Sequence, residues 1–159
     1  METHRIRNDK IGMLKRSEPK KKEFPKLILD SNALFVPLQF KLDIFEELNT
    51  LMNANYEPIL LSPNRQEIER LAREGSLKTR KEAAYALKLA EKCRLVELEI
   101  IGASADDVIV EVASKWKCPV FTNDRLLRKR LRDINVPVIY VRQKSRLEID
   151  GGLKPCLNL

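Results

Sequence analysis

The sequence predicts an α/β fold, a three-layer sandwich whose central, mostly parallel sheet of about five strands is flanked by helices. Short apolar runs alternate along the chain with amphipathic segments of ten or more residues, and crossovers of that length allow neighbouring strands to run parallel. The 159 residues suit one domain, and the 43% apolar content is enough for a packed core.

Three regions differ in composition. Residues 1–25 form a basic N-terminal arm that we expect to be flexible, residues 26–150 form the folded domain, and residues 151–159 form a C-terminal tail. Residues 1–26 hold nine Lys and Arg against four Asp and Glu, whereas the remainder holds 21 against 19. A basic surplus of this kind favours a polyanionic partner. Solubility alone is the competing explanation.

Strands and helices alternate through the domain. The expected strands are 26–30, 57–61, 95–101, 119–122 and 137–141. The expected helices are 41–54, 62–73, 77–92, 104–116 and 125–133. The boundary between the second strand and its helix is set by Ser62 as N-cap and Pro63 as first helical residue, and Gly75 ends that helix.

Acidic residues occur at every one of the first four junctions from strand to helix. Asp30 ends the first strand, and Glu67 lies near the start of the helix after the second. Asp106 and Asp107 open the helix after the third strand, and Asp124 follows the fourth. Right-handed crossovers bring the carboxyl ends of parallel strands to one edge of the sheet, where such folds place their sites. We therefore expect these side chains to gather there.

Clustered carboxylates repel one another, and a hard divalent cation relieves that repulsion. One or two Mg²⁺ or Mn²⁺ ions held in this way can promote phosphodiester hydrolysis. Histidine catalysis is not expected, because the single histidine, His4, lies on the basic arm. Each acid taken alone also has a local explanation as a helix cap or turn residue. Their shared position favours a common site.

Four stretches resemble PIN-domain nucleases, and the resemblance covers residue 26 to about residue 150. They run from Leu27 to Asn32, from Ser62 to Leu71, from Ala105 to Ala113 and from Val120 to Leu127. The resemblance implies a parallel sheet flanked by helices and cleavage of single-stranded RNA with Mg²⁺ or Mn²⁺. The catalytic and metal-binding residues that it implies are Asp30, Glu67, Asp106 and Asp124. The supporting residues that it implies are Asn32, Asp107 and Thr122.

Two branches of that family fit the chain. The Ala105-Asp106-Asp107 triplet, the basic helix 125–132 and the segment 146–149 are similar to PIN proteins of small-subunit pre-rRNA processing. The toxin-type ribonucleases of toxin–antitoxin pairs share the acid pattern. The first branch implies an rRNA precursor and ribosome-assembly proteins as partners, and the second implies an antitoxin. Either branch is compatible with a homodimer.

Basic side chains near the acids are candidates for holding the RNA backbone. The candidate RNA-binding residues are Arg125, Arg128, Lys129, Arg132, Lys20, Lys21 and Lys22. Contacts of this kind give salt-sensitive affinity with little base preference, and a solvated basic helix face is the alternative.

Two other functions stay open: a non-catalytic RNA-binding scaffold and a phosphoacceptor or phosphatase domain. The phosphatase domain is disfavoured because Asn32 stands where it would want a second Asp. The three scattered cysteines indicate a cytoplasmic protein without disulfides, and no apolar run is long enough to span a membrane.

Overall fold

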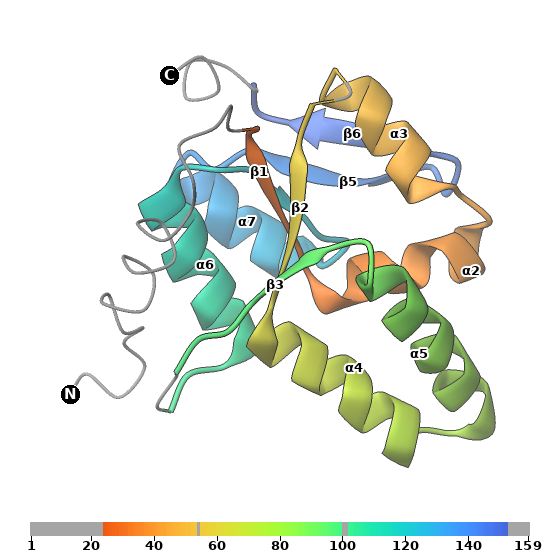
Figure 1. The fold of residues 1–159 in the computed structure, drawn as a ribbon. Helices are drawn as coiled ribbons and strands as arrows, with labels where there is room; N and C mark the ends of the chain where they lie inside the picture. The colour runs from red at the N-terminus through yellow and green to blue at the C-terminus, as the bar shows by residue number, and fades with distance from the viewer. Residues whose placement is uncertain (1–23, 54, 100–101, 153–159) are drawn as a thin grey trace.

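The computed structural model describes residues 24–53, 55–99 and 102–152 (Figure 1). The strands are β1 (Lys26–Leu29), β2 (Glu57–Leu61), β3 (Arg94–Val96), β4 (Val120–Phe121), β5 (Val138–Arg142) and β6 (Arg146–Asp150). They form a six-stranded sheet in the order β3-β2-β1-β4-β5-β6, which is parallel except for the antiparallel pair β5 and β6. The expected basic arm, including Lys20, Lys21 and Lys22, and most of the expected tail lie outside the described residues.

Six α-helices and one short 3₁₀ helix flank the sheet within the described residues. They are η1 (Ser31–Phe35), α2 (Val36–Phe40), α3 (Ile44–Leu51), α4 (Ser62–Glu74), α5 (Leu77–Ala90), α6 (Ala105–Trp116) and α7 (Arg125–Asp133). None of the helices in this part of the chain has the length and apolarity needed to cross a membrane.

The expected layers are confirmed, because the two faces of the sheet bury different side chains. Leu29 of β1 and Phe121 of β4 pack with η1, α2, α3, α4 and α5. Ile28 and Val120, one residue earlier on the same strands, pack with α6 and α7. This alternation follows from the two-residue period of a strand. Figure 1 shows α6 and α7 covering one face, with α2, α3 and α5 on the other.

Two elements differ from expectation at the edges of the sheet. The expected strand 95–101 is reduced to β3, because its partner β2 ends at Leu61, which pairs with Val96, and α4 begins at the next residue. The strand β6 was not expected. Its polar residues alternate with Leu147 and Ile149, and it pairs along β5 from Arg142–Arg146 to Val138–Asp150 as the outer strand of a hairpin.

The segment after β1 and the start of α4 also differ. Residues 31–40, for which no helix was expected, form η1 and α2. Helix α4 begins at Ser62 itself, with Leu61 as N-cap. The Ser62 hydroxyl is therefore not a cap; it accepts a hydrogen bond from the Leu98 N–H at 3.0 Å and ties α4 to the chain beyond β3.

The centre of the sheet contains the point where the strand order reverses. β1 pairs with β2 on one side and with β4 on the other, so the carboxyl ends of β1 and β4 are adjacent. Helix α6 carries the chain back across the sheet from β3 to β4. Ligand sites of open parallel sheets lie at such reversals. Asp30 directly follows β1 there.

Candidate active site

Asp30 is the buried centre of the site, with 4% of its surface exposed. As N-cap of η1, it accepts the Ser31 backbone N–H on Oδ1 at 2.7 Å. The Asn64 Nδ2 donates to the same oxygen at 3.2 Å, and the Thr122 hydroxyl donates to Oδ2 at 2.6 Å. Donors from η1, from α4 and from the loop after β4 therefore orient one carboxylate.

Burial dominates the ionisation of Asp30. It raises the pKa of this carboxyl to about 6, since a charged form in the interior loses its hydration. The hydrogen bonds from Thr122 and Ser31 oppose the rise, whereas the negative charges of Asp106 and Glu67 add to it. Asp30 is therefore largely ionised at neutral pH, but at a free-energy cost that a cation would reduce.

Glu67 is tied to Asp30 through a serine. The Ser31 hydroxyl donates to Glu67 Oε1 at 2.8 Å and lies 3.4 Å from Asp30 Oδ1. Glu67 stands in the second turn of α4 rather than at its start. Among the described residues, its side chain accepts a hydrogen bond from Ser31 and none from a backbone N–H of that helix. The helix-cap explanation that the sequence left open for Glu67 is therefore wrong.

Asp106 extends the acidic cluster from the first turn of α6. Its pKa is raised, first by burial and then by the charges of Asp124 and Glu67, while the Arg130 guanidinium lowers it. Asp107 behaves differently. It pairs with Arg130 at 2.9 Å, which lowers its pKa, and its N–H is capped by the Ser104 hydroxyl at 3.1 Å. Asp106 therefore belongs to the cluster, and Asp107 holds the arginine beside it.

Asp124 joins the cluster while capping a helix. Its Oδ1 accepts the backbone N–H groups of Leu126 at 2.8 Å and Leu127 at 3.2 Å, which makes it the N-cap of α7. Its own N–H donates to the Thr122 hydroxyl oxygen at 3.1 Å. Thr122 is fully buried and so connects Asp30 to Asp124 through one hydroxyl.

The other predicted supporting residue, Asn32, fixes the loop between β4 and α7. Its Oδ1 accepts the Asn123 N–H at 3.0 Å, and the Asn123 Oδ1 in turn accepts the Val141 N–H at 3.4 Å. These bonds join η1, the loop and β5, so the loop that carries Asp124 is held from both sides.

Two positioning residues were missed by the sequence analysis. Ser31 bridges Asp30 and Glu67, and Asn64 donates to Asp30 across 34 residues of sequence. Both lie within the stretches that carry the family resemblance, directly beside predicted acids or in the same helix turn. Their polarity in otherwise apolar surroundings was the available signal, because buried polar side chains need partners.

The donor set suits a hard divalent cation. Four carboxylates influence one another electrostatically, and the buried Asn64 Oδ1 finds no hydrogen-bond partner among the described residues. In that same part of the chain, however, no three acidic, histidine or cysteine side chains stand close enough to share one ion. The acids thus form a charge cluster whose side chains must still move to coordinate a metal together.

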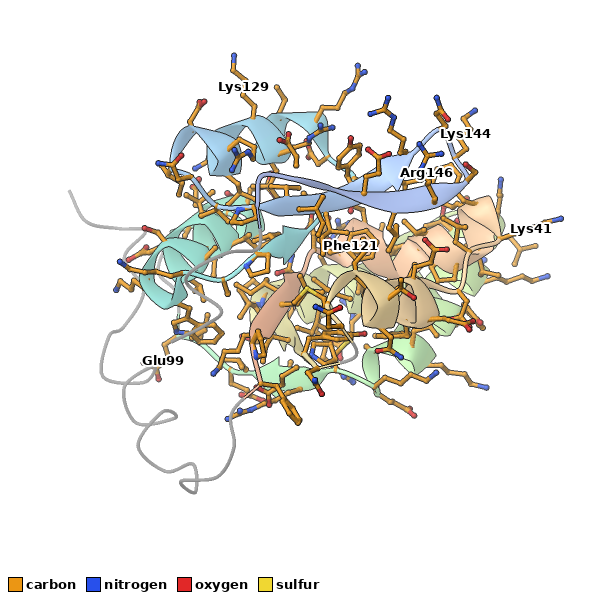
Figure 2. All side chains as sticks on the ribbon, turned by 90° about the horizontal axis from the view of Figure 1, so that it is seen from above. Lys41, Glu99, Phe121, Lys129, Lys144 and Arg146 are labelled. Carbon is orange, nitrogen blue, oxygen red and sulfur yellow. The ribbon has the colours of Figure 1, made fainter. Side chains whose placement is uncertain are left out.

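Two of the candidate RNA-binding arginines form ion pairs within the fold. Arg128 and Arg132 both pair with Asp150 of β6, at 3.0 and 3.2 Å. Arg125 and Lys129 of the same helix are exposed, and Figure 2 shows Lys129 pointing outward from α7. Helix α7 therefore presents a basic outer face and uses two arginines to hold the hairpin of β5 and β6.

Comparison with known proteins matches a family model described as "PIN like domain" over residues 27–144. Ribonuclease VapC4 of Methanocaldococcus jannaschii is 32% identical over 127 residues, which are 79% of this chain and 97% of that protein. Ribonuclease VapC9 of Archaeoglobus fulgidus is 26% identical over 150 residues, covering 94% and 98%. The rRNA-processing protein fcf1 of Schizosaccharomyces pombe is 33% identical over 127 residues, covering 77% of this chain and 62% of that protein.

A solved structure agrees with these relatives. The PIN domain endonuclease Utp24 superposes with a TM-score of 0.65 at 32% identity, over 77% of this chain and 90% of that one. The residues that the family model matches run from β1 to β5 and include all four acids. The chain belongs to the PIN-like domain family.

Proposed function

We propose that the chain is an Mg²⁺- or Mn²⁺-dependent endoribonuclease that hydrolyses phosphodiesters in single-stranded RNA, with an rRNA precursor as substrate. The observation that carries the proposal is an electrostatic cluster of four carboxylates from four separate junctions. Asp106 and Glu67 act on the buried Asp30, and Asp124 and Glu67 act on Asp106. Relatives named as a ribonuclease and as an rRNA-processing protein support the substrate class.

The residues proposed to hold one or two metal ions are Asp30, Glu67, Asp106 and Asp124. The chemistry that Mg²⁺ or Mn²⁺ supplies in such sites is a bound water of lowered pKa and neutralisation of charge on the departing oxygen. The protein's part is orientation: Thr122, Ser31 and Asn64 hold Asp30, and the α7 backbone holds Asp124. Asp107 keeps Arg130 beside Asp106.

The test is cleavage of a single-stranded RNA by the purified protein with Mn²⁺. Asp30→Asn and Asp106→Asn should each reduce the rate at least ~100-fold, in the range for loss of a metal-site group. Asp133→Asn, an exposed change at the end of α7, is the matched control and should cleave normally. Equal cleavage by all four proteins would overturn the proposal. Tight RNA binding that EDTA does not weaken, together with no cleavage products, would indicate a non-catalytic scaffold instead.

A second candidate is a toxin-type ribonuclease with an antitoxin partner. It is favoured by one observation: the chain spans 97% of the VapC4 sequence but 62% of the fcf1 sequence. Expression of the protein in a bacterial host separates the two. Growth arrest that Asp30→Asn abolishes supports the toxin, whereas unimpaired growth with cleavage of rRNA precursors in vitro supports the processing enzyme. The cytoplasmic location and a homodimer stay predictions.

A further inference from the structure

A pocket of about 420 Å³ opens directly beside the acidic cluster. It lies between the start of α7 and the hairpin of β5 and β6, and it shares Thr122 and Asp124 with the proposed catalytic site. Its volume falls within the ~300–1,000 Å³ of small-ligand sites. Any group bound there would be a close neighbour of whatever lies over the acids.

One wall of the pocket is a rigid stack of an arginine on a tyrosine. The Arg128 guanidinium carbon lies 3.6 Å from the centre of the Tyr140 ring, and its Nε is 3.0 Å from Asp150 Oδ2. The Tyr140 hydroxyl donates to Glu148 Oε1 at 3.2 Å. Both carboxylates belong to β6, whose residues pair in register with β5, so the stack is fixed by the hairpin.

Two further arginines line the pocket and carry the positive charge. Arg142 lies 3.3 Å from Glu148 Oε1 and is about half exposed, and its exposed face is available to an anion. The side chain of Arg125, which is exposed, has no hydrogen bond or ion pair within the described residues. Among the residues that line the pocket, Arg125, Arg128 and Arg142 outnumber the single acid, Asp124. The lining of the pocket therefore carries an excess of positive charge next to an acidic site.

We infer that this pocket binds one nucleotide of the RNA, immediately next to the phosphodiester to be cleaved, and so positions the strand over the acids. Arg125 and Arg142 take the phosphate, because guanidinium groups bind phosphate oxygens in a directed, often bidentate way. The base lies against the Arg128–Tyr140 stack, since guanidinium planes and aromatic rings both stack on bases. The inference rests on the proposed function, because it is the acids that make the neighbouring phosphodiester the reacting one.

Another pocket argues for this choice by contrast. This hollow, of about 330 Å³, lies between the end of α6 and the start of β5, and its lining includes one basic side chain, Lys117. It includes none of the four acids. Charge, a stacking surface and proximity to the acids coincide only in the pocket at α7 among the described hollows.

Binding in EDTA tests the phosphate contacts without any catalysis. A short fluorescent single-stranded RNA is titrated by anisotropy at several salt concentrations. The double variant Arg125→Ala with Arg142→Ala should bind ~10-fold or more weakly, with a salt slope reduced by ~0.7 for each lost phosphate contact. Arg80→Ala, which removes an exposed arginine from α5, is the control and should bind as the wild type does. Equal loss in both proteins would overturn the inference.

An abasic scan in Mn²⁺ tests the base. RNA substrates carrying one abasic nucleotide at successive positions are compared by kcat/KM. One position next to the cleavage site should lower the wild-type value ~10-fold, and Tyr140→Leu should remove that position dependence. A response that is uniform along the strand, or unchanged in Tyr140→Leu, would overturn the inference. If the wild type cleaves no RNA, the proposed function fails, while the anisotropy titration still decides whether the pocket binds the strand.

Discussion

The carboxyl group of Asp30 is buried, and burial disfavours its charged form. Its folded-state pKa of about 6 exceeds the ordinary value of 3.8, so the folded protein binds a proton more tightly than the unfolded chain does. The contribution of Asp30 to the stability of the wild type should therefore fall as the pH rises from about 4 through 6, and the full penalty from this residue should apply above that range. This is the opposite of a salt-bridged carboxylate, whose stabilisation disappears at low pH.

Replacing Asp30 by Asn should therefore stabilise the metal-free protein at neutral pH. Two pKa units correspond to ~3 kcal/mol as an upper limit, and we expect a gain of roughly 1–3 kcal/mol near pH 7.5 that vanishes near pH 4. Urea unfolding in EDTA at both pH values measures it. A variant that is less stable than wild type near pH 7.5 would show that the hydrogen bonds from Thr122 and Asn64 outweigh the buried charge.

Asn64 is the residue whose role the geometry indicates most directly. Its Nδ2 supports Asp30 while its Oδ1 has no partner among the described residues. Asn64→Ala should weaken Mn²⁺ binding ~10-fold or more, because groups that orient a ligand contribute that much. Calorimetric titration of the metal is the measurement, with Asn49→Ala on the exposed face of α3 as control. Unchanged Mn²⁺ affinity would limit Asn64 to packing.

Such residues mark the limit of what the sequence predicts. The acids were found because each follows a strand, and strand ends of a parallel sheet share one edge by topology alone. Ser31 and Asn64 act through hydrogen bonds that span 36 and 34 residues, and those bonds exist only once α4 has packed beside η1. Patterns within a short stretch of sequence do not predict hydrogen bonds between residues so far apart in the chain.

At the scale of elements, the same reasoning separates what was predicted from what was not. Helices α5, α6 and α7 follow from their apolar spacing and from caps such as Ser104. The hairpin strand β6 was missed because its two inward residues, Leu147 and Ile149, are too few for a pattern. Its position depends on tertiary contacts, including Glu47 of α3, whose Oε1 accepts the Leu147 N–H at 3.1 Å.

Helix α7 depends on a residue that is also proposed to be catalytic, and the two roles can be separated. Asp124→Ser keeps an N-cap hydroxyl, whereas Asp124→Ala removes the cap. Both should abolish cleavage, but only the alanine variant should lose about 1 kcal/mol in urea unfolding. A serine variant that still cleaves RNA would reduce Asp124 to a structural cap. Equal stability of the two variants would show that the cap is dispensable.

At the scale of the whole molecule, the sheet holds the acids close to one another although their negative charges repel. β1 and β4 lie at the centre, with buried layers on both faces, so Asp30 cannot move away from Asp106 and Glu67 without disturbing the core. The described acids are not drawn together around a single point. The fold therefore keeps the negative charges in place, and a bound cation would be needed to reduce their repulsion.

That arrangement predicts that a divalent cation stabilises the entire domain. Binding to the folded state alone contributes about 2.7 kcal/mol when the ion is at ~100 times its Kd, which for a chain of this size raises Tm by roughly 5–10 °C. Mn²⁺ should therefore raise Tm in differential scanning fluorimetry, and EDTA should reverse the shift. In Asp106→Asn the shift should shrink, because one ligand and one repelling charge are lost together. Asp133→Asn should respond as the wild type does. If Mn²⁺ shifts the Tm of all three proteins equally, the ion binds elsewhere, and the acids repel one another without holding a metal.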